Sequence, residues 1–312
     1  MTDLQVRKMR FGFADYDVPF LWNETNPGFS AMANAVSFLA VAFEKMIGAM
    51  IPEAKPLITD AAVAEEADAF VRQEGQHSMA HRQHVKGLIR SYPALKETFD
   101  AVLAAFDDLT ANAPLKYRLA YTADLEATFT PVFKLMLDND DTLFAPGDDR
   151  VASLFLWHFV EEVEHRSSAL IIYDHVVADP FYRVRVVRSV FKHVMDTLRI
   201  AAHGFNQHVP LAERKVDAMS TFVPYRYKHA LLQRLPGRRP ADNGPVVNAF
   251  AHLPVREQLA ALTGVVRSQL PNHKPAHEKL PVLAAEWFDR YDNGYDVTQW
   301  YTATANGKDA HA

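Results

Sequence analysis

The 312-residue sequence contains no cysteine. This absence excludes disulfides, zinc–thiolate sites, iron–sulfur clusters and cysteine nucleophiles. Any metal ion would have to be held by His, Glu and Asp side chains, which suit iron, manganese or zinc. The remaining composition is that of a globular protein, with 49% hydrophobic and 23% charged residues. The chain is long enough for one large core or two modest ones.

Long apolar runs are also missing. Residues 1–17 contain no apolar signal core. No uncharged apolar run approaches the roughly 20 residues that a membrane-spanning helix needs. Strand-like alternation, solenoid repeats and low-complexity tracts are absent as well. We therefore expect a mostly α-helical, cytoplasmic protein without a transmembrane segment.

Charge is distributed unevenly along the chain. Residues 1–180 hold 15 Lys and Arg against 27 Asp and Glu, residues 181–240 hold 12 against 3, and residues 241–312 hold 6 against 8. The basic region 181–240 could face an anionic substrate, an acidic partner or a membrane surface. We favour the simpler interpretation, in which it packs on the acidic N-terminal part or is solvated.

Proline, glycine and capping residues divide the chain into helical segments. The predicted helices occupy residues 30–50, 62–90, 93–111, 114–138, 154–177, 181–205, 246–269 and 280–292. Pro52 and Pro56 are expected to end the first helix, and Asp60 to cap the second. We expect an all-α fold in which residues 1–180 form a ferritin-like four-helix bundle. Residues 181–312 would form a helical extension packed on that bundle, within one structural domain.

The segment Leu154–Leu170 indicates a buried helix that carries polar side chains. At about 100° per residue, His158, Glu162 and His165 fall on one face, whereas Glu164 lies opposite and Glu161 lies off to the side. Buried polar groups without partners cost several kcal/mol. A metal ion bound by this face would remove that cost.

Three other predicted helices supply matching side chains. Glu44 lies on the apolar face of the first helix, Glu74 and His77 converge on one face of the second, and Glu126 lies inside residues 114–138. Together with the last helix, the order is Glu, Glu-x-x-His, Glu, Glu-x-x-His. This is the ligand pattern of ferritin-like di-metal carboxylate bundles. The alternative, a bundle with buried ion pairs, is costly for six such groups.

His158 lies one turn before Glu162 and extends the motif to His-x-x-x-Glu-x-x-His. It is either a seventh ligand or a histidine that hydrogen-bonds a ligating carboxylate, and spacing alone leaves both open. For His81 and His84, further along the second helix, we favour solvent-facing or hydrogen-bonded side chains. The predicted metal ligands are Glu44, Glu74, His77, Glu126, His158, Glu162 and His165.

These ligands resemble those of ferritin-like di-iron proteins, and His158 resembles the extra histidine of the di-iron N-oxygenases that convert aryl amines to nitro compounds. Residues from about 10 to 179 also resemble a bacterial family of predicted metal-dependent hydrolases. The stretches FLWNETNPGFSAMANAVSFL, FVRQEGQHSMAH and LWHFVEEVEH carry this second resemblance. Residues 181–312 match that family only loosely, and nothing in these residues shows hydrolysis.

The resemblance implies a non-haem di-iron oxygenase or oxidase. It would use two iron ions (manganese or zinc being alternatives), O2 and an electron donor to oxidise a small apolar or aromatic substrate, N-oxygenation included. Phe38, Phe129 and Phe155 are expected to line the site and exclude water. The alternatives are a dinuclear hydrolase with a metal-bridging hydroxide and non-enzymatic metal storage. We expect no nucleic-acid partner, whereas peripheral membrane contact and a homodimer are compatible with the sequence.

Overall fold

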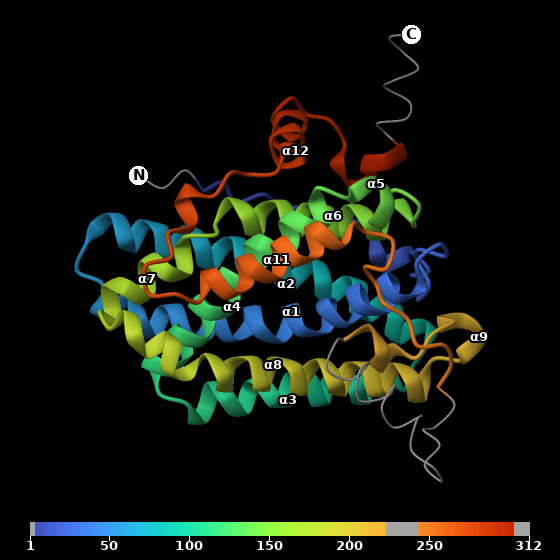
Figure 1. The fold of residues 1–312 in the computed structure, drawn as a ribbon, viewed down its shortest axis with the longest axis horizontal. Helices are drawn as coiled ribbons and strands as arrows, with labels where there is room; N and C mark the ends of the chain where they lie inside the picture. Colours follow the sequence, from blue (N-terminus) through green and yellow to red (C-terminus); the bar gives the residue numbers. More distant parts are fainter. Residues whose placement is uncertain (1–3, 223–242, 303–312) are drawn as a thin grey trace.

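The computed structural model describes residues 4–222 and 243–302, and these residues form helices and connecting loops without a strand (Figure 1). The predicted all-α class is confirmed. The α-helices are α1 (Pro27–Ala54), α2 (Ala61–Ser91), α3 (Leu95–Asn112), α4 (Leu115–Leu137), α5 (Asp140–Leu143), α6 (Asp149–Glu164), α7 (Ser168–Val177), α8 (Pro180–His208), α9 (Leu211–Arg214), α11 (Val255–Ser268) and α12 (Val282–Asp292). The 3-10 helices are η1 (Phe13–Asp15), η2 (Lys55–Leu57), η3 (Ala218–Thr221), η4 (Pro275–His277) and η5 (Val297–Gln299).

The helices α1, α2, α4 and α6 surround the centre of the molecule. The helix α1 packs along α2, α4 packs against α6 and α7, and α2 packs against both α6 and α7. The helices α3 and α8 lie side by side along α1, and α11 covers α4 (Figure 1). The C-terminal elements of the described chain therefore pack on the bundle.

The long apolar helix α1 is a core element. By length and composition, Pro27–Leu57 could cross a membrane, but 72% of its most apolar window is buried inside the fold. Its start is fixed by Asn26, whose side chain accepts a hydrogen bond from the Phe29 amide, and by Pro27 in the first turn. Most of its large apolar side chains are buried, and the helix packs against α2, α3, α4 and α8, which explains its composition.

Proline does not end α1 where we predicted. The helix continues through Pro52 to Ala54, and Pro56 lies in η2. The ring of Pro52 removes the hydrogen bond to the carbonyl of Gly48. Both residues lie on an exposed side of the last turns, so the loss leaves no buried carbonyl without a donor. The predicted cap of α2 is confirmed, because the Asp60 carboxylate accepts hydrogen bonds from two amides of the first turn.

The predicted continuous helix over residues 154–177 is wrong. The chain breaks after Glu164, His165 is the C-terminal cap of α6, and α7 starts at Ser168. The guanidinium of Arg166 donates to the carbonyl oxygen of Val163 at 2.7 Å and so replaces a backbone donor at this helix end. No proline or glycine marks the break. The three-residue spacing from Glu162 to His165 survives because the cap continues the last turn.

The C-terminal helices are shorter than predicted. Of the predicted helix 246–269, only Val255–Ser268 is helical, and the predicted helix 280–292 begins at Val282. The segment before α11 is held by Asn26, whose amide donates to the carbonyl oxygen of Ala249 at 2.8 Å. Near the N-terminus, η1 precedes the first predicted helix.

Candidate metal centre

The seven predicted ligands converge in the middle of the bundle. They form two groups in which the possible ligand atoms lie within 4.8 Å of one another. The groups are Glu44, His77 and His158, and Glu74, Glu126, Glu162 and His165. All seven side chains are at most 4% exposed. They come from α1, α2, α4 and the C-terminal end of α6, so four separate elements position them.

Two glutamates lie between the two groups. Glu162 Oε1 lies 2.8 Å from His158 Nε2, and Glu162 Oε2 lies 3.2 Å from His165 Nε2. Glu74 likewise presents Oε1 to His165 Nε2 at 3.2 Å and Oε2 to His77 Nδ1 at 3.9 Å. Each carboxylate therefore offers one oxygen to each group, which is the arrangement of a bridging ligand.

The other two glutamates lie at the outer sides of the cluster. Glu44 Oε1 is 3.5 Å from His158 Nε2, and Glu126 Oε2 is 3.4 Å from His165 Nε2. Each of these carboxylates therefore accompanies one imidazole of one group. The cluster has two halves, each with an outer carboxylate and imidazole nitrogen, joined by two shared carboxylates.

The residues present fit a pair of divalent cations. Glu44 Oε2, both oxygens of Glu74, both oxygens of Glu126 and His77 Nδ1 are buried and have no hydrogen-bond partner. Orphaned buried polar atoms are rare because each costs free energy. Two dications would give these atoms ligand bonds and would match the charge of four carboxylates. The oxygen and nitrogen donors suit iron, manganese or zinc.

The electrostatics lead to the same conclusion. Burial, and then the charge of Glu74, raises the pKa of Glu44 well above its ordinary value. Burial followed by repulsion from Glu162 raises the pKa of Glu126 in the same way. Burial opposes the charged form of His165, but the surrounding carboxylates, Glu162 first, raise its pKa well above the ordinary value. Protons thus neutralise the cluster where cations would otherwise do so.

A second ring of polar side chains orients the histidines. His77 Nε2 lies 2.8 Å from Glu161 Oε2, and Arg7 donates to the other oxygen of Glu161 at 2.9 Å. His165 Nδ1 lies 3.1 Å from the amide oxygen of Gln73. These bonds fix which imidazole nitrogen faces the carboxylates, as outer partners of metal-bound histidines commonly do.

The two halves are related by a local repeat in the sequence. Gln73 directly precedes the bridging Glu74, and Glu161 directly precedes the bridging Glu162. Each of these preceding residues orients the histidine of the opposite helix. The sequence had placed Glu161 off to the side and did not identify Gln73. Their adjacency to the bridging glutamates is the signal that could have found them.

The repeat breaks one turn before each bridging glutamate. His158 precedes Glu162 by four residues, and the residue that precedes Glu74 by four is Phe70. The ring of Phe70 packs edge-on against His165, with centroids 5.1 Å apart. One half of the centre therefore has an imidazole where the other has an apolar ring.

His158 faces the carboxylates with one nitrogen and a chain of hydrogen bonds with the other. Its Nδ1 lies 2.7 Å from His81 Nε2, and Ser37 Oγ then connects His81 to His84. His81 and His84 are buried, so the solvent-facing alternative is wrong and the hydrogen-bonded alternative is correct. Burial lowers the pKa of His84 to about 3. Ser37 was not singled out from the sequence.

Aromatic rings close the walls of the centre. Trp157 packs against His77 with centroids 4.9 Å apart, and Phe133 packs near His158 at 6.2 Å. Of the predicted lining residues, Phe155 contacts His81 and Phe129 stacks on Phe133, so both lie one layer further out. The expectation for Phe38 is wrong, because its ring packs against those of Phe99 and Phe205 near α3 and α8.

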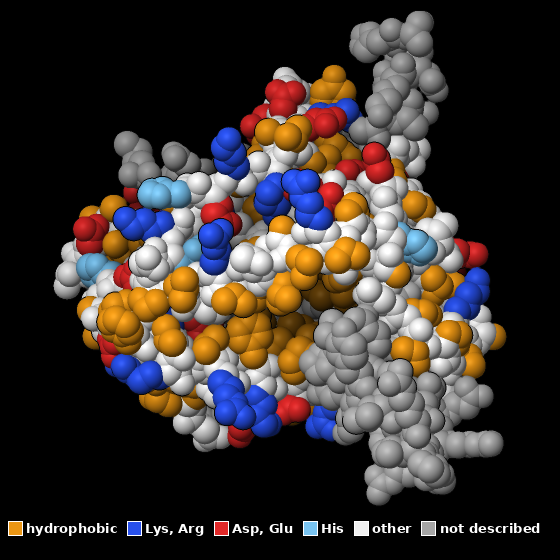
Figure 2. Space-filling model, viewed as in Figure 1, with side chains coloured by type: hydrophobic (Ala, Val, Ile, Leu, Met, Phe, Trp, Pro, Cys, Tyr) orange, Lys and Arg blue, Asp and Glu red, His pale blue; other side chains and the backbone are white. Residues whose placement is uncertain are grey.

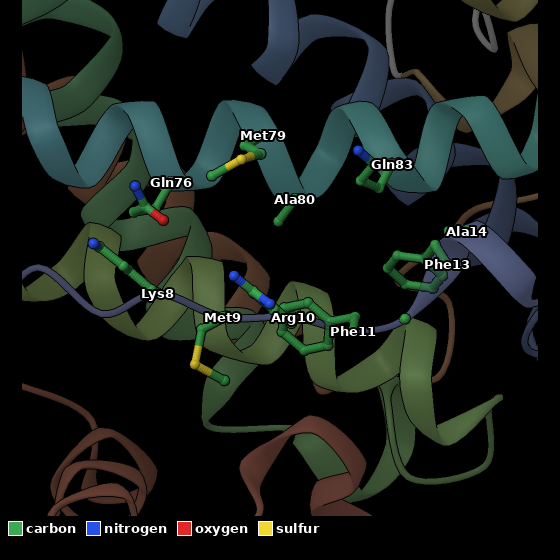
Figure 3. Close-up of a pocket in the computed structure, with 11 residues that line it drawn as sticks. Lys8, Met9, Arg10, Phe11, Phe13, Ala14, Gln76, Met79, Ala80 and Gln83 are labelled. Carbon is green, nitrogen blue, oxygen red and sulfur yellow. The ribbon is translucent and has the colours of Figure 1, made fainter.

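A surface groove of about 310 Å³ lies next to the centre but does not reach it. It runs between residues 8–14 and α2, with Gln76, Met79 and Gln83 on the helix side (Figure 3). None of its lining residues belongs to the two ligand groups. Phe11, at the edge of the groove, contacts Trp157, which separates the groove from His77.

A protein-family model described as "predicted metal-dependent hydrolase" matches residues 5–235, which is 231 of the 312 residues. The chain belongs to this family. The matched span contains all seven clustered residues and the whole of α8. It therefore extends beyond residue 179, where the resemblance seen in the sequence ended. No curated protein and no solved structure matches the chain. Family membership and the Glu/His clusters together support a metal-dependent protein of enzymatic type.

Proposed function

We propose that the seven clustered residues hold two metal ions and that the protein is a di-iron enzyme that uses O2 to oxidise a small apolar or aromatic substrate. The observation that carries this proposal is the pair of shared carboxylates, Glu74 and Glu162, each facing an imidazole of both groups. Two iron ions that shared these two carboxylates would together supply two electrons to one reactant. Iron bound there would supply the reduction of O2 and the oxidation of the substrate.

The residues would give the two ions different numbers of protein ligands. Glu44, His77 and His158 would hold the first ion, and Glu126 and His165 would hold the second. Counting the two shared carboxylates, five side chains would hold the first ion and four would hold the second. The residue one turn before Glu74 is Phe70, which donates no ligand atom, whereas the residue one turn before Glu162 is His158.

The outer residues prepare the imidazoles for this role. A proton on His77 Nε2 donates to Glu161, so the lone pair of Nδ1 faces the carboxylates. A proton on His165 Nδ1 donates to Gln73, so Nε2 faces inward. Fixing the tautomer before binding removes the reorganisation that a free imidazole would need. Trp157, Phe133 and Phe70 exclude water from the space around these groups.

The closed surroundings favour a small reactant. All seven donors are buried and aromatic rings pack around them, so the centre would favour a small apolar reactant such as O2 over a polar substrate with its leaving group. Carboxylate-rich shells stabilise the oxidised state of iron. The comparison with other carboxylate-bridged bundles is an analogy and adds to this argument without replacing it.

Anaerobic loading with ferrous iron tests the proposal. We expect two irons per chain, and a transient visible absorption when O2 is added. Replacing His165 by Ala should lower the iron content and abolish the transient. His193→Ala is the matched control, because His193 is a half-buried histidine that bonds Tyr121 outside the centre. One iron per chain, or no reaction with O2, would contradict the proposal.

Hydrolysis is the second candidate, because the family description names it. A bound metal would then supply an activated water in place of O2 chemistry. The two functions separate in one experiment. Protein loaded with zinc or manganese is incubated without O2 with a panel of carboxylic and phosphoric esters. Turnover under these conditions, together with an iron form inert to O2, would establish the hydrolase and overturn the oxygenase.

A further inference from the structure

The helix α11 exposes its large apolar residues to the outside. Val255 is 69% exposed, Leu259 58%, Leu262 60% and Val266 63%. They follow one another by four, three and four residues, so they form a single stripe along the helix. Leu270, just beyond the helix end, continues the stripe and is 48% exposed. An amphipathic helix of a globular protein normally turns such a stripe toward the core.

The opposite side of α11 is the one that packs on the protein. Gly264 faces α4, where a Cβ atom on it would lie 2.6 Å from the Cβ of Pro131. Ser268 is buried, and the carbonyl oxygen of Ser268 accepts a hydrogen bond from Arg183 of α8. Small residues of α11 therefore make the contact with the protein, and the aliphatic stripe faces outward.

Charge around the stripe is positive. Arg256 and Arg267 are exposed and lie along one flank, roughly 80–100° from the centre of the stripe at 100° per residue. The one acidic residue of α11, Glu257, points to the bundle side and accepts a hydrogen bond from Asn139. Lys274 and Lys279 follow in the exposed segment after the helix. The outward half of α11 thus combines aliphatic side chains with cations and contains no acidic side chain.

The same face of the molecule extends this pattern. Figure 2 shows apolar side chains gathered across the middle of the face that carries α11 and α8, with Lys and Arg side chains on both sides. On α8, Phe181 is 62% and Val184 43% exposed, and Arg188 is exposed further along the helix.

We propose that this face docks on the surface of an anionic phospholipid membrane. The stripe of α11 would enter the boundary between headgroups and acyl chains, and Arg256 and Arg267 would contact lipid phosphates. Aliphatic stripes with flanking cations and no acidic residue are the pattern of interfacial helices. A second copy of the chain fits less well. Two copies that met through it would bring the exposed arginines of both chains together, whereas the acidic Glu257 of α11 points to the bundle side.

Vesicle sedimentation tests this proposal on the full chain. We expect binding to vesicles of phosphatidylcholine mixed with phosphatidylglycerol, weak binding to phosphatidylcholine alone, and weaker binding at high salt. The double variant Leu259→Glu/Leu262→Glu should reduce the bound fraction at least about tenfold. Leu57→Glu is the control, because Leu57 is an aliphatic residue of similar exposure, 54%, in η2 and outside α11 and α8.

Three outcomes would overturn the proposal. They are the absence of binding to anionic vesicles, equal binding by the double variant, and a dimer in analytical ultracentrifugation that the double variant dissociates. Circular dichroism and metal content verify that each variant is folded. The assay needs no turnover, so its result is independent of whether the metal centre is an oxygenase or a hydrolase.

Discussion

The orientation of each histidine is decided by one hydrogen bond. His77 presents Nδ1 to the centre because Glu161 binds its Nε2, whereas His158 and His165 present Nε2 because His81 and Gln73 bind their Nδ1. The sequence identified the ring-bearing residues by periodicity, but it could not show which nitrogen each would use. That choice depends on partners up to 92 positions away.

Glu161→Gln should weaken metal binding about tenfold, because the amide holds His77 less firmly than the carboxylate does. Isothermal titration with a divalent metal measures this. Glu66→Gln is the control, because Glu66 is a half-buried glutamate of α2 that accepts a hydrogen bond from Ser168 outside the two groups. Equal affinities of the two variants would show that Glu161 has no special role.

His84→Asn should flatten the acid dependence of stability. Burial holds the pKa of His84 at about 3, below the ordinary 6.5. The stabilisation is therefore complete above pH 6.5 and is lost as pH falls toward 3, because the unfolded chain takes up a proton that the folded chain refuses. The slope of unfolding free energy between pH 6 and 4 should fall by up to about 1.4 kcal/mol per pH unit. Urea unfolding at several pH values measures it, and parallel curves would contradict it.

At the scale of elements, α4 connects the metal centre to the C-terminal part. It carries Glu126 toward the cluster, packs against α11 through Pro131, and pairs with α8 through Asp124, which accepts from Arg183 at 2.8 Å. Both partners of this ion pair are buried. This contact is one instance of the basic region packing on the acidic bundle, the interpretation favoured from the sequence. Inside α4, Pro131 is the residue against which Gly264 of α11 packs.

The contact between Gly264 and Pro131 predicts opposite effects for one substitution at two glycines. Gly264→Ala should destabilise the protein by about 1–3 kcal/mol, because the new methyl group meets a rigid ring. Gly48→Ala should stabilise it by about 0.5–1 kcal/mol, since Gly48 is helical and no atom lies within 4 Å of its added Cβ. Urea unfolding compares the two, and changes of the same sign would contradict the packing argument.

At the scale of the whole molecule, the acidic N-terminal part contains a cluster that is short of positive charge. Four buried carboxylates belong to the centre, whereas the nearby Arg7 forms its ion pairs with Glu161 and Glu164, which lie outside the two groups. Arg7 also lies 4.5 Å from the ring centroid of Phe288, so the segment before η1 meets α12 beside the cluster. Nothing in the sequence signalled this contact.

Removal of metal should lower the melting temperature by several degrees. Each bound dication stabilises only the folded chain, by about 2.7 kcal/mol when the free metal is at a hundredfold excess over its Kd. Differential scanning calorimetry with and without a chelator measures the shift. The stabilisation should shrink as pH falls, because protons compete for Glu44, Glu126 and the imidazoles. A melting temperature that does not respond to the chelator would show that the cluster is stable without metal.

The sequence by itself determined which side chains the bundle buries as a polar cluster. Glu44, Glu126 and the two Glu-x-x-His pairs lie on apolar helix faces, and a face is a local property set by 3.6 residues per turn. Helix existence, the cap at Asp60 and the all-α class followed from the same local rules. Boundaries did not follow where a distant contact contributes, as at the end of α6, where Arg166 also donates to the carbonyl oxygen of Pro275 at 2.9 Å.

Tertiary structure alone decided how the cluster is divided and supported. It placed Glu74 and Glu162 between the two groups and brought Glu161 and Gln73 within hydrogen-bond distance of a histidine on the opposite helix. It also turned the aliphatic stripe of α11 outward. The physical reason is the same in each case. Periodicity fixes the direction of a side chain relative to its own helix, whereas its partner depends on how that helix is rotated and placed against the others.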